Sequence, residues 1–235
     1  MDARSYRGAQ AMYCGVPEDL PYCVVGQSVI FLDMKTSRYL GLPQSSAPAF
    51  SRLIASDGEI DENDRGSLMP LFTRGYLTQI PGPQKMPRCP EIAAPRTDYV
   101  AANLGSAPPK YVLRAALAQI GMAARLATFS LPQILSWLRS RPLPDTTTTA
   151  DQELQLPQIA SAFASVSYAF GRADRCLLRS LAMFALCRKF GILTNLVIAV
   201  RSDPFSAHCW VQRESTVLND SVENVRTYIP ILVTK

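Results

Sequence analysis

Three residues in the last third of the sequence have side chains suited to acyl-transfer chemistry: Cys176, His208 and Asp220. His208 is the single histidine of the chain. Cysteine enzymes use a thiol, an imidazole and a carboxylate as nucleophile, as base and as the group that orients the base. The residue types and their order therefore indicate a cysteine nucleophile with His208 as its base.

The segment around Cys176 predicts a helix that contains the thiol in its first turn. Apolar residues recur at helical spacing between Arg175 and Phe190, and Asp174 and Gly191 suit the N-cap and the C-terminal stop. Unpaired backbone N–H groups and the positive dipole end of a helix start favour a thiolate, which is the nucleophilic form of cysteine. This position therefore favours reactivity.

Three short strands are predicted after this helix, over residues 193–200, 207–212 and 217–220. The second contains His208 and the third contains Asp220. Because the last two form a hairpin, the imidazole and the carboxylate are expected to lie on neighbouring strands, facing the start of the helix.

Other interpretations of these residues are common in proteins. A single cysteine in an apolar helix is more often a core residue than a nucleophile, and Cys187 fits that description. Cys209 alternates with His208 along its strand, so it is expected to face the other side of the sheet as a structural residue. Spacing alone leaves both a catalytic and a structural role open for Cys176.

Flanking residues also leave two interpretations open. Trp210 lies on the same strand face as His208 and either lines a site or belongs to the core. Arg172 and Arg175 either hold the thiolate or are solvated.

Three motifs surround the candidate residues, CLLRSLAM, PFSAHCWV and VLND. They resemble the transglutaminase-like cysteine peptidase domain of lasso-peptide B proteins, which combines a Cys-Leu-x-Arg-Ser-Leu helix start, a Pro-Phe-x-Ala-His-x-Trp-Val strand and a closing Asn-Asp. The resemblance is strongest over residues 150–225. It implies that Cys176 is the nucleophile, His208 the general base and acid, and Asp220 the orienting carboxylate.

The composition is typical of a folded globular protein. The chain has 235 residues, of which 48% are apolar and 18% charged, enough for one large domain or two small ones. Its net charge of +5 comes without a long basic run, so nucleic-acid binding is not expected.

Cysteine spacing and hydropathy exclude further classes. The six cysteines form no CxxC pair, which argues against a zinc site, and we expect no cofactor or metal. The start, MDARSYRGAQ, has no apolar signal core, and no apolar run reaches about 18 residues. We therefore expect a cytoplasmic protein with reduced thiols and no membrane span.

The N-terminal part predicts a small α+β unit after a loose segment, residues 1–20. Its expected elements are strands over 22–25, 28–33 and 38–42 and helices over 45–55 and 61–73. An open edge strand is a template for adding a peptide strand, although a merely structural subdomain fits the same pattern.

The stretch VIFLDMKTSRYLGLP in this unit resembles the winged-helix precursor-recognition domain, or PqqD-like fold, of lasso-peptide systems. The resemblance implies that a leader peptide pairs with the third strand and packs against the last helix. The leader-binding residues so implied are Arg38, Tyr39, Leu40, Gly41, Leu42, Leu68, Leu71, Phe72 and Tyr76.

Residues 83–109 are rich in proline and lack periodicity, which predicts a semi-extended linker with Cys89 as an exposed, non-catalytic thiol.

Residues 110–141 are predicted to be helical, and Pro132 either kinks this helix or starts a second one capped by Ser130. A helix over 151–169 is expected to pack on the Cys176 helix. The residues spaced to do so are Ile159, Phe163, Val166 and Phe170.

The expected fold class is α+β: a PqqD-like winged-helix recognition domain over residues 1–82, the linker, and a helical transglutaminase- or papain-like peptidase domain with a small antiparallel sheet over 110–235. The resemblance implies a cysteine peptidase that cleaves a ribosomally made lasso precursor at its leader–core junction. Its implied partners are the precursor and an asparagine-synthetase-like cyclase, which closes a macrolactam on the freed core amine. A transglutaminase-like acyltransferase and a non-catalytic precursor-binding chaperone stay open.

Overall fold

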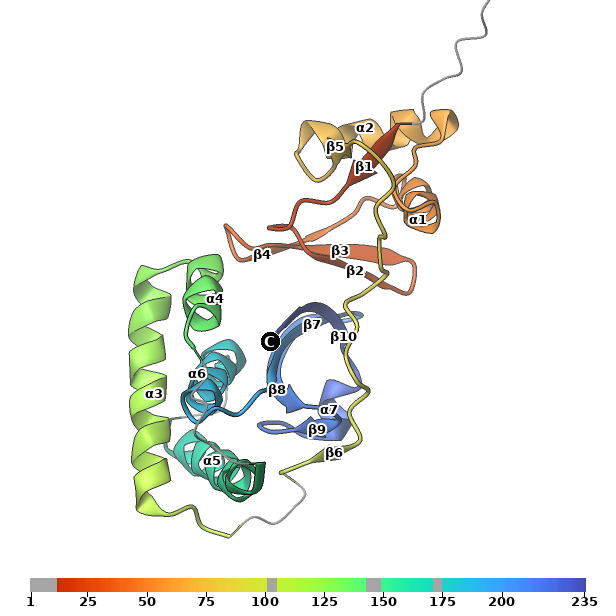
Figure 1. The fold of residues 1–235 in the computed structure, drawn as a ribbon. Helices are drawn as coiled ribbons and strands as arrows, with labels where there is room; N and C mark the ends of the chain where they lie inside the picture. Colours follow the sequence, from red (N-terminus) through yellow and green to blue (C-terminus); the bar gives the residue numbers. More distant parts are fainter. Residues whose placement is uncertain (1–11, 101–104, 143–148, 171–174) are drawn as a thin grey trace, which may run out of the picture. The chain divides into compact units, whose positions relative to one another are not determined.

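The chain divides into two compact units (Figure 1). The computed structural model describes residues 12–100, 105–142, 149–170 and 175–235. One unit contains the residues up to Asp33 together with Tyr39–Arg88, and the other contains Met34–Arg38 together with Cys89–Lys235.

A three-stranded sheet and two helices form most of the N-terminal unit. The strand order is β2-β3-β4, with β2 and β3 antiparallel. A 3₁₀ turn, η1, leads directly into the second helix. These elements agree with the expected α+β class, and their bounds are β2 Tyr22–Val25, β3 Ser28–Asp33, β4 Arg38–Gly41, α1 Ala47–Ala55, η1 Glu62–Asp64 and α2 Arg65–Thr73.

The same unit contains a strand pair that the sequence pattern did not predict. β1 (Tyr13–Gly15) pairs antiparallel with β5 (Thr78–Ile80), so part of the segment interpreted as loose is structured. Three-residue strands are too short to show alternation, which explains the error. β1 also contacts a turn, where the Cys14 N–H donates to the Gly58 carbonyl at 2.8 Å.

Aromatic and aliphatic side chains fill the core of this unit. Phe31 and Phe50 meet edge to face, with ring centroids 5.5 Å apart. Leu68 and Leu71 of α2 are each 1% exposed and belong to this core. The helix α2 is therefore fixed to the sheet by burial of its inner face.

A five-stranded mixed sheet organises the C-terminal unit, in the order β10-β7-β8-β9-β6. The pairs β10–β7, β7–β8 and β8–β9 are antiparallel, whereas β6 pairs parallel with β9, so the expected antiparallel sheet was wrong in this respect. The strands are β6 Thr97–Asp98, β7 Asn195–Ser202, β8 Phe205–Arg213, β9 Thr216–Val217 and β10 Ile229–Thr234.

Four longer helices of this unit pack against one another and on the sheet (Figure 1). Pro132 starts a second helix rather than kinking the first, because the Ser130 N–H donates to Gln133 Oε1 at 2.9 Å and caps the new helix. The helices are α3 Pro109–Thr128, α4 Leu131–Arg139, α5 Thr149–Phe170, α6 Cys176–Lys189 and the short α7 Val222–Val225. Of the residues expected to pack on α6, the side chain of Phe170 lies outside the described residues, whereas Ile159, Phe163 and Val166 are buried.

The proline-rich segment is partly built into this unit rather than being only a linker. Its strand β6 extends the sheet, and the Ala93 carbonyl accepts a hydrogen bond from Gln212 Nε2 at 2.6 Å. A two-residue parallel strand leaves no periodic pattern in the sequence, so the linker interpretation overlooked it. Among the described helices, none is both long and apolar enough to cross a membrane.

Candidate active site

The helix α6 begins at Cys176, one residue after the predicted start, and Arg175 occupies the N-cap position. The proposed cap Asp174 lies outside the described residues. At the other end Gly191 has φ of +71°, a left-handed conformation that glycine adopts without strain, and it terminates the helix. The thiol therefore lies in the first helical turn.

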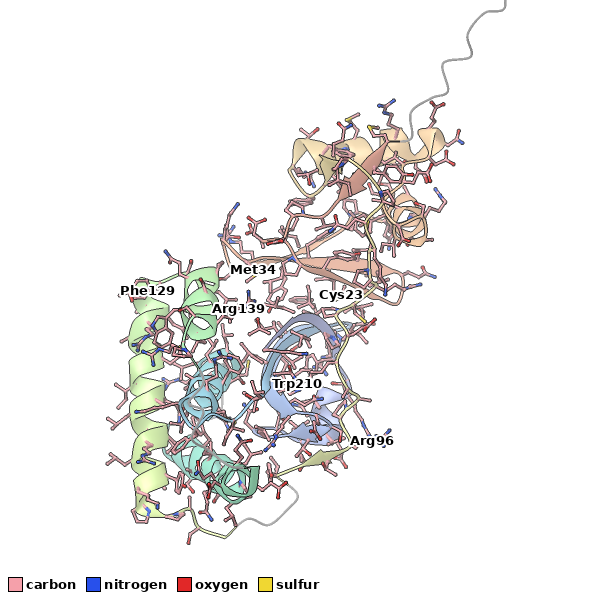
Figure 2. All side chains as sticks on the ribbon, in the orientation of Figure 1. Cys23, Met34, Arg96, Phe129, Arg139 and Trp210 are labelled. Atoms are coloured by element: carbon pink, nitrogen blue, oxygen red, sulfur yellow. The ribbon has the colours of Figure 1, made fainter. Side chains whose placement is uncertain are left out.

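The central strand β8 carries His208, directly opposite Ala199 of β7. Trp210 is two residues further on the same face, 2% exposed, and its ring stacks on the imidazole with centroids 6.1 Å apart. Its indole N–H donates to Gln212 Oε1 at 3.0 Å. Trp210 is thus a core residue that supports the imidazole ring, which decides between its two interpretations (Figure 2).

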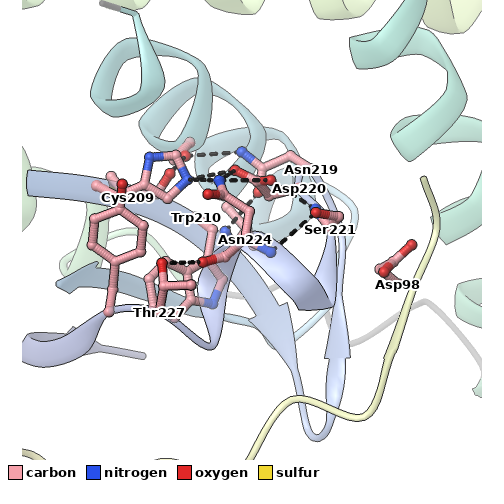
Figure 3. Close-up of polar contacts among 12 residues, drawn as sticks. Asp98, Cys209, Trp210, Asn219, Asp220, Ser221, Asn224 and Thr227 are labelled. Carbon is pink, nitrogen blue, oxygen red and sulfur yellow. Dashed lines mark hydrogen bonds and ion pairs between the residues drawn. The ribbon is translucent and has the colours of Figure 1, made fainter. Parts of the chain in front are cut away.

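The carboxylate of Asp220 bonds to Nε2 of His208. Asp220 does not lie on a strand, because β9 ends at Val217 and the chain bends away before Asp220. In this bend its carboxylate also accepts the Ser221 N–H, at 2.7 Å. The predicted strand over 217–220 was too long, whereas the predicted contact with His208 is present (Figure 3).

The three side chains perturb one another's ionisation. Burial alone raises the pKa of Cys176, but a hydrogen bond and charge from His208, together with the N–H groups of Cys209 and Leu177, lower it overall. Burial alone lowers the pKa of His208, but hydrogen bonds with Asp220 and Cys176 raise it to about 9. Since Nε2 faces Asp220, Nδ1 is the ring nitrogen left for the thiol. The arrangement favours a thiolate beside an imidazolium.

The pKa of Asp220 is lowered, which favours a negative charge beside the imidazolium. Burial alone raises it, but the His208 hydrogen bond, the Ser221 N–H and Asn224 lower it overall. The carboxylate therefore stays ionised at neutral pH, where it stabilises a positive charge on the imidazole.

A cleft of about 570 Å³ opens over these residues. Cys176, His208 and Asp220 reach it from α6, β8 and the bend after β9. Small residues of α5 contribute to another part of the lining, and Tyr99 and Val100 follow β6 into it. These α5 residues are Ala160, Ser161, Ala164 and Ser165. The three residues predicted to be catalytic thus share one concave, accessible site.

Comparison with protein families identifies the family of most of the C-terminal unit. Residues 117–233 match the transglutaminase-like superfamily. They form a transglutaminase-like domain. Neither the curated proteins nor the solved structures contain a match to this chain. Cys176, His208 and Asp220 all lie within the matched range.

The other cysteines of the transglutaminase-like domain are not positioned to act. Cys187 is 0% exposed in α6, and burial raises its pKa to about 12. Cys209 is 3% exposed, and burial raises the pKa of its thiol too. Among the residues that the structure describes, no group of three His, Cys, Asp or Glu side chains is placed to hold a metal ion.

The sequence patterns did not indicate two residues near the site: Asn224, which supports the carboxylate of Asp220, and Asp98, which supports the helix that carries Asn224. Asn224 Nδ2 lies 3.1 Å from Oδ1 of Asp220, and Asp98 in the proline-rich segment accepts the Val222 N–H at 2.8 Å (Figure 3). A Ser221-x-x-Asn224 pattern marks a helix start, and Ser221 Oγ does accept the Asn224 N–H. No local pattern indicates Asp98.

The residues implied to bind a leader peptide are distributed between surface and core. Strand β4 is at the edge of its sheet, and Tyr39 and Leu40 are partly exposed there. Tyr76 is partly buried against Phe31, with ring centroids 5.6 Å apart. Leu68 and Leu71 present almost no surface, so a bound peptide would meet the other residues of the set.

Proposed function

We propose that this protein is a cysteine peptidase that removes the leader from a ribosomally synthesised lasso-peptide precursor. The observation that carries the proposal is the convergence of Cys176, His208 and Asp220 in one cleft of a transglutaminase-like domain. The choice of substrate is supported by the motifs CLLRSLAM, PFSAHCWV and VLND, which resemble those of lasso-peptide B proteins.

The geometry supports an acyl-enzyme mechanism. The thiolate of Cys176 attacks the carbonyl carbon at the leader–core junction, and backbone N–H groups at the start of α6 stabilise the resulting oxyanion. The imidazolium of His208 donates its proton to the leaving amine, which releases the core. The leader remains on Cys176 as a thioester. His208 then takes a proton from water, which hydrolyses the thioester and frees the leader.

In this proposal the N-terminal unit holds the leader. β4 is an edge strand of its sheet, and addition of a peptide strand to a sheet edge is a common mode of peptide capture. We assign residues 1–82 to a PqqD-like recognition domain and 110–235 to the peptidase. Because Leu68 and Leu71 are in the core, we expect the direct contacts at β4 and at Phe72 and Tyr76.

The released amine indicates what the next reaction must be. A free core amine is the nucleophile for macrolactam formation, so we propose that a partner cyclase of the asparagine-synthetase type consumes the product. ATP would belong to that cyclase reaction.

Incubation with the linear precursor encoded beside this gene tests the proposal. Wild type, Cys176→Ala and the matched control Cys89→Ala are each followed by intact-mass spectrometry, with the cyclase added in a parallel set. We expect the wild type and Cys89→Ala to release the leader and Cys176→Ala to leave the precursor intact. Release by all three would contradict the assignment of Cys176. Bound but uncleaved precursor in every tube would favour the chaperone.

The match to the transglutaminase-like superfamily also favours a second candidate, transfer of the acyl group to an amine. The two reactions differ only in what attacks the thioester. Cleavage in ¹⁸O-labelled water with a labelled primary amine present separates them. Hydrolysis places ¹⁸O in the new leader carboxylate, whereas transfer places the labelled amine there.

A further inference from the structure

A second polar network lies beside the three candidate catalytic residues, with one member, Ser180, fully buried and another, Asn219, partly buried at the lining of the cleft. Ser180 of α6 is 0% exposed; its hydroxyl donates to the Cys209 carbonyl at 2.8 Å and accepts from Asn219 Nδ2 at 2.9 Å. Asn219 Oδ1 in turn accepts the Val211 N–H at 2.8 Å. The network thus links α6, β8 and the chain after β9 through three hydrogen bonds.

Ser180, Cys209 and Asn219 are each near one candidate catalytic residue in the sequence. Ser180 lies four residues after Cys176 on α6, so the two side chains lie on the same side of the helix. Cys209 directly follows the imidazole residue in β8, and Asn219 directly precedes the carboxylate residue. A movement within the network therefore moves the catalytic groups.

Residue 209 holds α6 at two points. Its N–H is close enough to the sulfur of Cys176 to lower the pKa of that thiol, and its carbonyl accepts from the hydroxyl of Ser180, one helical turn away. These two contacts one turn apart add directional polar contacts to a helix whose packing is otherwise apolar, with Leu181 and Phe184 each 0% exposed.

The early end of β9 makes this arrangement possible. Paired residues of β8 and β9 are Gln212 with Val217 and Arg213 with Thr216, so β9 does not extend along β8 to residue 209. Beyond that pairing the Val211 carbonyl still accepts the Leu218 N–H, but side chains bond two other backbone groups of β8, with Ser180 at the Cys209 carbonyl and Asn219 at the Val211 N–H. The catalytic side chains thus lie where a longer β9 would have paired with β8.

We propose that Ser180 and Asn219 are positioning residues whose hydrogen bonds hold the sulfur of Cys176 against the imidazole of His208. The proposal rests on the proposed function for the roles of the two residues that are positioned. Catalytic groups must be held within about 0.5 Å of their productive geometry, and a displacement of about 1 Å can reduce the rate about 100-fold.

The ionisation of Cys176 gives a readout that needs no peptide substrate. Only the thiolate reacts with iodoacetamide, so the pH dependence of alkylation reports how closely the imidazole and the Cys209 N–H approach the sulfur. Peptide mapping by mass spectrometry follows Cys176 alone. The partly exposed Cys89, alkylated in the same sample, reports the reactivity of the reagent.

We expect Ser180→Ala to raise the pH midpoint of Cys176 alkylation by roughly one unit, which is about a tenfold smaller thiolate fraction below that midpoint. Asn219→Ala is expected to shift the midpoint in the same direction. Ser180→Thr keeps the hydroxyl but adds a methyl group to a filled site, so it should lower Tm while retaining a midpoint close to that of the wild type.

Leu135→Ala is the control for general destabilisation. Leu135 is 1% exposed in α4 and does not line the cleft, so its truncation lowers Tm without touching the network. A Ser180→Ala midpoint equal to that of wild type, with only Tm lowered as in Leu135→Ala, would overturn the proposal. If Ser180→Ala does not fold, Ser180→Cys, with its weaker donor, carries the same test. A shifted midpoint supports the proposal even if no precursor is cleaved.

Discussion

The side-chain amide of Asn224 lies within hydrogen-bond distance of both carboxylate oxygens of Asp220, 3.1 Å from Oδ1 and 3.2 Å from Oδ2. The same nitrogen is 3.5 Å from Nε2 of His208. Asn224 therefore lies beside both the imidazole and the carboxylate, and its two hydrogen bonds help to hold the carboxylate in place (Figure 3).

We predict that Asn224→Ala lowers kcat/KM for leader release about tenfold, because a hydrogen bond to a charged group is worth about 1.5–3 kcal/mol and the exposed position of Asn224 places it at the low end of that range. KM should change little, since the amide acts on Asp220 and not on the peptide. The neighbouring exposed Glu223 supplies the control, and Glu223→Ala should keep the wild-type rate. An unchanged rate for Asn224→Ala would refute this role.

The contact between Asp98 and α7 leads to a second prediction. Asp98 Oδ2 accepts the N–H of Val222, the first residue of α7, and so supports the helix that carries Asn224. Asp98→Ala should lower kcat/KM several-fold and speed amide exchange at Val222, whereas Asp98→Asn keeps an acceptor oxygen and most of the rate. Thr97→Val, which removes only the exposed hydroxyl contact with Thr216, is the control. Equal rates for all variants would show that the Asp98 contact does not support catalysis.

The pKa values predict a specific pH dependence. The thiolate–imidazolium pair exists above the lowered pKa of Cys176 and below the pKa of His208 of about 9. Asp220 stabilises the imidazolium, so in Asp220→Asn the imidazolium loses its proton more readily and its pKa falls. The alkaline limb of the kcat/KM profile should therefore move to lower pH in Asp220→Asn. A limb that stays in place would mean that another group sets it.

A turn in the N-terminal unit predicts a stability effect that is independent of catalysis. Gly58 has φ of +91°, and a Cβ built there would lie 2.4 Å from the Cys14 carbonyl oxygen. Left-handed backbone strain is about 1–2 kcal/mol for a residue with a Cβ, and the clash adds to it. Gly58→Ala should thus lower the thermal transition of this unit clearly.

Two other glycines calibrate the Gly58→Ala measurement. Gly26 has φ of +60° with nothing within 4 Å of a built Cβ, so Gly26→Ala should show the backbone strain alone. Gly66 lies inside α2, also in open space, and Gly66→Ala should stabilise by about 0.5–1 kcal/mol. If Gly58→Ala behaved like Gly26→Ala, the close approach of Cys14 would be disproved.

The sequence predicted the elements with strong local patterns. Helix α6 begins one residue after the predicted start, and strands β2 and β3 have the predicted bounds, because capping residues and alternation are local signals. The contact of His208 with Asp220 followed from hairpin geometry even though Asp220 lies beyond the strand.

What the sequence did not predict depends on residues distant in the chain. Asp98 contacts a helix 124 positions further along the chain, and Ser180 meets Asn219 39 positions away. Short strands such as β1 and β6 owe their structure to partners and not to their own composition. Such contacts leave no periodic signal, so only the folded structure reveals them.

The most direct test of the central claim is the covalent state of Cys176 during turnover. Wild type and precursor are mixed, quenched in acid at early times and mapped by mass spectrometry. The account predicts a leader-derived acyl group on the peptide that contains Cys176, together with an unprocessed precursor in the parallel Cys176→Ala reaction. Leader release by Cys176→Ala at the wild-type rate would contradict it.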